Sequence, residues 1–169
     1  MKNKKIVKIA TAAMFAALVT GLTFFPKIPI PGGGYVHLGD AVIYLAASFL
    51  PLPYAMSAAA IGGLLADVFS GYAVYVPFTV VAKALLTVAF TSKETKILTR
   101  RNCLAPLCGL IITPVVYLIA DTILYDFGGA VPGIIWNIAQ AAASLPVFFV
   151  IGAAADKGKL KNKISSKIN

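Results

Sequence analysis

Long apolar runs, separated by short stretches that are polar or rich in Pro and Gly, make up most of this chain. About 20 apolar residues cross a bilayer as a helix, and the sequence predicts six such segments. They cover residues 6–25, 40–52, 54–71, 72–91, 103–125 and 131–155. The runs are long and lack the alternation of barrel strands, so helices are the expected spanning form. We expect an all-α integral membrane protein with a single six-helix transmembrane domain over residues 1–169, in which residues 156–169 form a basic tail.

The composition supports this interpretation. The chain is 59% hydrophobic, its mean hydropathy is +0.86, and only 12% of its residues are charged, whereas soluble domains carry about 25% charged residues. The net charge of +9 does not indicate a nucleic-acid partner, because the basic residues flank apolar runs and form no surface interleaved with aromatic residues.

Basic residues gather in three places, and these predict the orientation. The first cluster lies within residues 2–8, the second within 93–101 and the third within 157–167. Basic flanks remain cytoplasmic, so both termini and the central loop are expected in the cytosol. Six crossings agree with this arrangement. If the short second segment did not cross, the central cluster and the C-terminus would change sides and the agreement would be lost.

Polar residues inside the apolar segments are candidates for a binding site, because charged groups cost about 2.5–3.5 kcal/mol each at the centre of a membrane helix. With the orientation above, polar groups from four helices gather near the outer face, beneath the loop of residues 26–39. Helical spacing places several of them on shared faces. The candidate substrate-binding residues are His37, Asp67, Tyr75, Thr79, Lys83, Tyr117, Asp121, Trp136, Asn137 and Gln140.

Aromatic side chains mixed with amide and charged groups suit a pocket for a small, flat, polar molecule. Other interpretations stay open for each group. Tyr72, Tyr125 and Trp136 are also suited to an interfacial aromatic belt. Asp67 and Lys83 could form a buried structural pair, since Asp67 is the neighbour we expect for Lys83; whether Lys83 contacts substrate or only pairs with Asp67 stays open.

Further alternatives concern the amides, the histidine and the loop. Asn137 and Gln140 could join helices, and His37 could be a solvated loop residue. The Pro- and Gly-rich loop of residues 26–39 could cap the site or act only as a connector. Cys103 and Cys108 are expected to be free cysteines without a metal-binding role.

Several chemistries have no motif in this sequence. The glycines of residues 32–34 are not followed by Lys and Ser or Thr at the spacing of a phosphate-binding loop, and neither H-E-x-x-H nor G-x-S-x-G occurs. We therefore expect no catalytic residue, no metal and no cofactor. If the protein drives uptake, the energy must come from a partner or from an ion gradient.

Small residues form a second pattern in the first segment. Ala12 and Ala16, and likewise Ala13 and Ala17, are spaced so that two helices can approach closely. These four alanines either pack inside the protein or form a surface on which another membrane subunit docks.

The order of four motifs resembles that of a known family. The motifs are the alanine-rich first helix, HLGDAVIYLAA (residues 37–47), GGLLADVFSGY (62–72) and VPFTVVAKAL (76–85). Together they resemble the S components, the substrate-binding membrane subunits, of energy-coupling factor (ECF) vitamin transporters, in the branch of riboflavin-type and hydroxymethylpyrimidine-type members. The resemblance covers most of the chain and implies an S-component-like bundle with both termini in the cytosol.

The resemblance also implies a function. It implies that a small aromatic vitamin or precursor, either pyrimidine- or pyridoxine-like or riboflavin-like, is captured at the extracellular side and covered by the first loop. It implies a transmembrane coupling subunit and two ATPase subunits as partners, with Ala12, Ala13, Ala16 and Ala17 docking on the coupling subunit. We expect a multi-pass protein of a bacterial plasma membrane that is not an enzyme. An autonomous carrier or channel is the alternative, and a small membrane enzyme is the third possibility.

Overall fold

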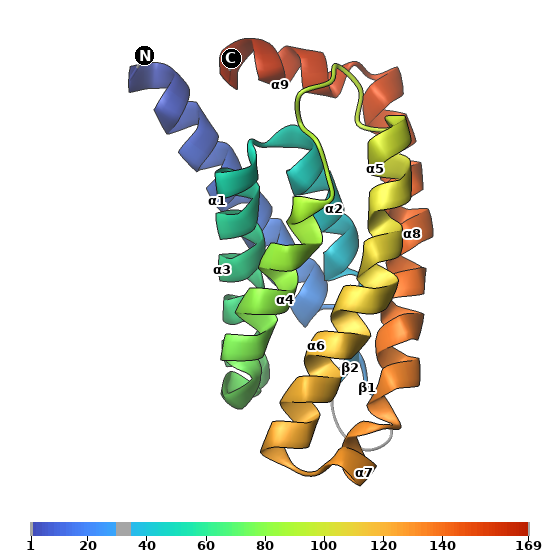
Figure 1. Ribbon diagram of the computed structural model, residues 1–169. Helices are drawn as coiled ribbons and strands as arrows, with labels where there is room; N and C mark the ends of the chain where they lie inside the picture. The colour runs from blue at the N-terminus through green and yellow to red at the C-terminus, as the bar shows by residue number, and fades with distance from the viewer. Residues whose placement is uncertain (1, 30–34, 169) are drawn as a thin grey trace.

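The computed structural model describes residues 2–29 and 35–168 as a bundle of helices with one small hairpin (Figure 1). The helices are α1 (Lys2–Phe24), α2 (Gly39–Phe49), α3 (Leu52–Ser70), α4 (Val76–Val88), α5 (Arg100–Leu104), α6 (Gly109–Leu124), α7 (Phe127–Ala130), α8 (Gly133–Lys157) and α9 (Leu160–Ile168). Two 3-10 turns, Ala73–Tyr75 and Ala105–Cys108, precede α4 and α6. The strands β1 (Ile28–Pro29) and β2 (Tyr35–Val36) pair antiparallel. The segment 30–34, at the centre of the predicted capping loop, lies outside the described residues.

Four helical stretches are long and apolar enough to cross a membrane. They are Lys4–Phe24, Leu52–Ser70, Arg100–Leu124 and Phe127–Lys157, while Gly39–Phe49 and Ala73–Val88 are shorter apolar helices. Proline and glycine set several boundaries, since Pro53 lies in the first turn of α3 and Gly71 ends that helix with a left-handed φ of 82°. The predicted fourth segment is shorter than expected, because its helix begins after a 3-10 turn and ends at Val88.

The short helix α2 occupies the centre of the bundle. Every one of its residues is buried, and it contacts α1, α3, α4 and α8. Tyr44 on this helix stacks on Phe90 with ring centroids 5.2 Å apart, and Phe148 of α8 meets Tyr44 edge-on at 5.8 Å. These three rings, which we call the aromatic plug, fill the middle of the molecule.

Helices α1 and α3 pack closely, and this packing corrects one prediction. A side chain at Gly62 of α3 would lie 2.8 Å from the carbonyl oxygen of Ala16, so only glycine fits there. Ala16 and Ala12 are buried in this contact, whereas Ala13 and Ala17 are exposed on the other side of α1. The prediction that all four alanines face a docking partner is therefore wrong for Ala12 and Ala16, which the helical repeat turns inward.

The loop between α4 and α5 is held by side chains of α5 and α8. Asn102 is fully buried and its amide nitrogen donates hydrogen bonds to Ser48 Oγ and to the carbonyl oxygens of Thr91 and Ile97. Asp156 of α8 accepts the backbone N–H groups of Ile97 and Leu98. The loop is thus fastened to the bundle rather than left as a free connection.

Helix α9 lies within the segment predicted as a basic tail. It runs across the end of the bundle where the N-terminus and the α4–α5 loop also lie (Figure 1). Lys161 on this helix is buried and donates to the carbonyl oxygen of Lys96 at 3.2 Å. Because burial disfavours its charged form, the pKa of Lys161 lies below its usual value. All three basic clusters thus lie at one end of the molecule, which we call the basic end, and the hairpin and α7 lie at the other.

Candidate functional site

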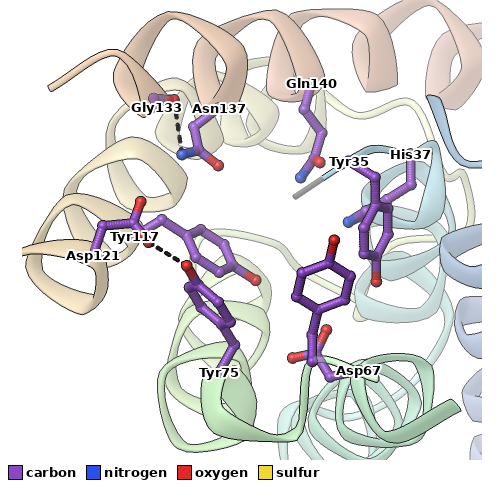
Figure 2. A pocket seen from close by; sticks show the side chains of 10 residues that line it. Tyr35, His37, Asp67, Tyr75, Tyr117, Asp121, Gly133, Asn137 and Gln140 are labelled. Carbon is purple, nitrogen blue, oxygen red and sulfur yellow. Dashed lines mark hydrogen bonds between the residues drawn. The ribbon is translucent and has the colours of Figure 1, made fainter. Parts of the chain in front are cut away.

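A cavity opens at the end of the bundle opposite the basic end (Figure 2). Its empty space, including the open mouth, is about 610 Å³. The lining residues come from the hairpin and the segment after it, from the C-terminal halves of α3 and α6, from the turn before α4 and from the beginning of α8. They are Tyr35, His37, Asp67, Tyr72, Tyr75, Tyr117, Asp121, Gly133, Asn137 and Gln140.

Four tyrosine rings form a continuous wall of this cavity. Tyr35 lies 5.4 Å from Tyr72, Tyr72 lies 6.1 Å from Tyr75, and Tyr75 lies 6.3 Å from Tyr117, measured between ring centroids. None of the pairs is stacked face to face, so the rings line a curved surface rather than close on one another. Such a wall suits a flat aromatic ligand. We call it the tyrosine wall.

Polar groups lie next to the tyrosine wall and across the cavity from it (Figure 2). The hydroxyl of Tyr75 donates to Asp121 Oδ1 at 2.6 Å, and this hydrogen bond joins α6 to the start of α4 (Figure 2). Asn137 donates from its amide to the carbonyl oxygen of Gly133 at 3.0 Å, within its own helix. Because Gly133 carries no side chain, the Asp121 carboxylate can lie close to the backbone of α8: a Cβ there would be 3.2 Å from Asp121 Oδ2.

A buried ion pair forms the floor of the cavity and corrects another prediction. Lys83 Nζ lies 2.6 Å from Asp40 Oδ1, and both side chains are inaccessible to solvent. Gln140 donates to the second oxygen of Asp40 at 3.3 Å. The expected pairing of Lys83 with Asp67 is therefore wrong, because α2 lies at the centre of the bundle and brings Asp40, in its first turn, next to the ammonium group.

Thr79 and Lys83 lie beneath the lining rather than in it. The hydroxyls of Thr79 and Tyr117 are 2.9 Å apart and share a hydrogen bond, which holds the Tyr117 ring against α4. Both Thr79 and Lys83 are about 1% exposed. Their contribution is to support the side chains that a ligand would touch.

His37 lies between the hairpin and α2 and is buried. Its Nδ1 accepts the backbone N–H of Gly39 at 3.1 Å, so this nitrogen carries no proton. Burial, aided by the positive charge of Lys83, lowers the pKa of His37 to about 3. The imidazole is thus neutral at physiological pH. It is not the solvated loop residue that the sequence also allowed.

The hairpin adds Tyr35, which the sequence analysis did not single out. Its ring lies 5.7 Å from the imidazole of His37. Burial raises the pKa of its hydroxyl to about 12, so Tyr35 remains a hydrogen-bond donor at any physiological pH. The spacing Tyr-x-His before a buried helix was the only signal in the sequence that could have indicated it.

The structure brings seven of the ten predicted residues into the lining: His37, Asp67, Tyr75, Tyr117, Asp121, Asn137 and Gln140. Trp136 is not among the lining residues and is 37% exposed, because adjacent helix positions point about 100° apart and Asn137 faces the cavity. Tyr125 is also outside the cavity, at 66% exposure. Tyr72, which suited an interfacial belt equally well, belongs to the lining.

Comparisons with known proteins identify a family and a solved structure to which this chain is similar. A family model described as "ECF-type riboflavin transporter, S component" matches residues 3–157. A solved structure titled "Structure and mechanism of the S component of a bacterial ECF transporter" is similar over 93% of this chain and 98% of that chain, with a TM-score of 0.69 and 21% sequence identity. This likeness concerns the fold. A search of curated proteins gives no match.

Proposed function

Because the chain belongs to the family of S components of ECF-type riboflavin transporters, we propose that its cavity captures one small aromatic vitamin or precursor at the extracellular face. S components are multi-pass membrane proteins of bacteria and form a transporter family rather than an enzyme family. The tyrosine wall is the observation that carries the proposal, since it offers a flat ligand an aromatic surface opposite a set of polar anchors.

The arrangement of charge supports an extracellular cavity. All three basic clusters lie at the basic end, away from the cavity (Figure 1), and basic flanks remain in the cytosol. We infer six crossings with both termini inside, in which α2 and α4 are the short spans. Their length would be sufficient because they lie inside the bundle, where neighbouring helices rather than lipid surround them.

A partner must supply the energy for uptake. The chain has no phosphate-binding loop, so we infer that it works with a transmembrane coupling subunit and two ATPase subunits. The exposed face of α1 that includes Ala13 and Ala17 supports a docking surface, because small side chains allow another helix to approach closely.

The family model supports a riboflavin-like ligand, and the lining is also suited to a pyrimidine- or pyridoxine-like ring. A flavin ring system is flat and carries both hydrogen-bond donors and acceptors, which the hydroxyl, carboxylate and amide groups of the cavity can match. We therefore place riboflavin first among the ligands to be tested.

The floor of the cavity argues against an autonomous carrier. Below Lys83 and Asp40 the aromatic plug of Tyr44, Phe90 and Phe148 fills the space between α2, α8 and the α4–α5 loop. A cavity at the basic end shares no lining residue with this one; it is lined by Thr91, Glu94, Thr99, Arg100 and Arg101. We infer that a solute bound at the outer end rests above this packed aromatic layer and is not passed through the chain alone.

Reconstitution in proteoliposomes tests the proposal. Vesicles that contain this protein with the coupling subunit and ATPases should accumulate radiolabelled riboflavin, or another aromatic vitamin from a panel, only when ATP is supplied to the ATPases. Vesicles with this protein alone should bind the vitamin without accumulating it. Accumulation by the protein alone would establish an autonomous carrier and contradict the proposal.

A further inference from the structure

One carboxylate in the cavity has an oxygen without a partner. Asp67 lies in the last turns of α3, lines the cavity and is 6% exposed. Its Oδ2 atom is buried and forms no hydrogen bond with any described residue. A buried polar atom without a partner costs about 1–3 kcal/mol, so its retention in the wall of a cavity calls for a compensating group.

The neighbours of Asp67 do not provide that group. Thr79 and Tyr35 are hydrogen-bonding neighbours of the Asp67 carboxyl group and Lys83 adds its positive charge, but Oδ2 itself has no partner among the described residues. Thr79 shares its hydrogen bond with Tyr117, and the Lys83 ammonium is bound to Asp40 at 2.6 Å.

The described lining residues also carry more negative than positive charge. Asp67 and Asp121 are both lining residues, while no Lys or Arg is among the residues described there. Asp121 already accepts the hydroxyl of Tyr75, and His37 is neutral because its Nδ1 accepts a backbone N–H. The cavity thus offers hydrogen-bond acceptors that a ligand has to satisfy, and it would repel an anionic group placed beside Asp67.

We propose that Asp67 is the ligand anchor of the site, and that its free oxygen accepts a hydrogen bond from an N–H or O–H group of an aromatic ligand lying on the tyrosine wall. The inference rests on the proposed function and narrows it. The ligand class is an aromatic ring that presents a donor, and is neutral or cationic, at the end that meets Asp67.

Replacing the carboxylate with an amide of the same shape tests this role. In D67N the affinity for the ligand should fall about 10- to 100-fold, the range for a hydrogen bond to a charged group. The melting temperature of the ligand-free protein should stay equal to that of the wild type or rise, because Oδ2 has no partner to lose and the remaining amide oxygen can still accept from Thr79 and Tyr35. A purely structural Asp67 would instead lose stability on substitution.

The measurements use purified full-length protein in detergent, with riboflavin, pyridoxine and thiamine as separate probes in equilibrium titrations. D126N is the matched control, because Asp126 caps the exposed turn at Gly129 and Asn caps a helix equally well. Its affinity and melting temperature should equal those of the wild type.

The outcomes distinguish a failure of the Asp67 anchor from a failure of the proposed vitamin-binding function. Wild-type binding of one probe with weakened binding in D67N supports the anchor. If wild type and D67N bind that probe within about threefold of each other, or if ligand-free D67N melts well below the wild type, the anchor is refuted and the proposed function stands. If folded wild-type protein binds none of the three probes, both the vitamin-binding proposal and the anchor fail.

Discussion

At the scale of single residues, the Lys83–Asp40 pair separates the ligand cavity from the core of the bundle. Both groups are fully buried, and Gln140, which lines the cavity, also donates to Asp40. Buried ion pairs are strongly stabilising only relative to the state in which one partner is missing, because a lone buried charge costs several kcal/mol. Lys83 therefore has a structural role that its sequence context alone did not indicate.

Removing the ammonium alone should be severe. K83M leaves Asp40 buried without its cation, and we expect it to destabilise the protein by about 3–5 kcal/mol. The double variant K83M/D40N should recover most of this loss, since the amide that replaces the carboxylate is neutral and its oxygen can still accept from Gln140. Thermal unfolding in detergent measures both.

Ligand affinity in the same double variant decides whether Lys83 touches the substrate. We expect affinity close to that of the wild type, because the Lys83 ammonium is 1% exposed and is directed at Asp40. A large loss of affinity in a double variant with wild-type stability would show that Lys83 contacts the ligand directly.

His37 should make stability depend on pH. Its pKa is about 3 in the folded protein and 6.5 when unperturbed, so the unfolded chain binds the extra proton first. The contribution of neutral His37 to the free energy of unfolding is fully present above pH 6.5. It falls by about 1.4 kcal/mol per pH unit as the pH drops from there toward the folded pKa.

The variant H37N provides the comparison, because the Asn oxygen can accept the N–H of Gly39 in place of Nδ1 and does not titrate. Melting temperatures measured between about pH 4 and 8 should diverge once the pH falls below the unperturbed pKa, with the wild type losing more. Parallel curves for the two proteins would show that His37 is not held neutral.

At the scale of elements, the close contact of α1 and α3 divides the alanines of α1 into two sets. Ala16 is packed where even a Cβ on Gly62 would not fit, while Ala13 is exposed. The sequence showed the small-residue pattern but not which face of α1 each alanine occupies, since the helix is apolar all around and carries no polar face to mark the outside.

Two leucine substitutions on α1 should therefore behave differently. A16L overpacks the α1–α3 contact and should destabilise the protein by about 1–3 kcal/mol. A13L should keep the melting temperature and ligand affinity of the wild type but reduce ATP-driven uptake in vesicles with the complete transporter. Unchanged uptake by A13L would place the docking surface elsewhere.

Much of the site was predictable because polar residues in apolar helices are rare. The face of α8 with Asn137 and Gln140 followed from helical spacing, as did the placing of Tyr117 and Asp121 on one face of α6. The role of Asp40 did not follow, because it depends on how α2 inserts into the centre of the bundle. Tyr35 and Tyr72 lie in or next to short turns without periodicity, where spacing gives no information on direction.

At the scale of the whole molecule, the two ends have different chemistry. The end with the cavity carries aromatic and acidic groups, and the basic end carries the loop held by Asn102 and Asp156 together with α9. Between them, α2 and the aromatic plug close the bundle. This division of chemistry supports the proposal that the protein binds a ligand at one end and relies on a partner to move the ligand across the membrane.

Native mass spectrometry of the purified full-length protein, after incubation with riboflavin and a panel of aromatic vitamins, tests this account most directly. We expect a complex of one protein with one vitamin that forms without ATP and is depleted in D67N. A spectrum that shows only the free protein and lipid adducts, with no vitamin bound at any concentration tested, would contradict the assignment of the cavity as a capture site.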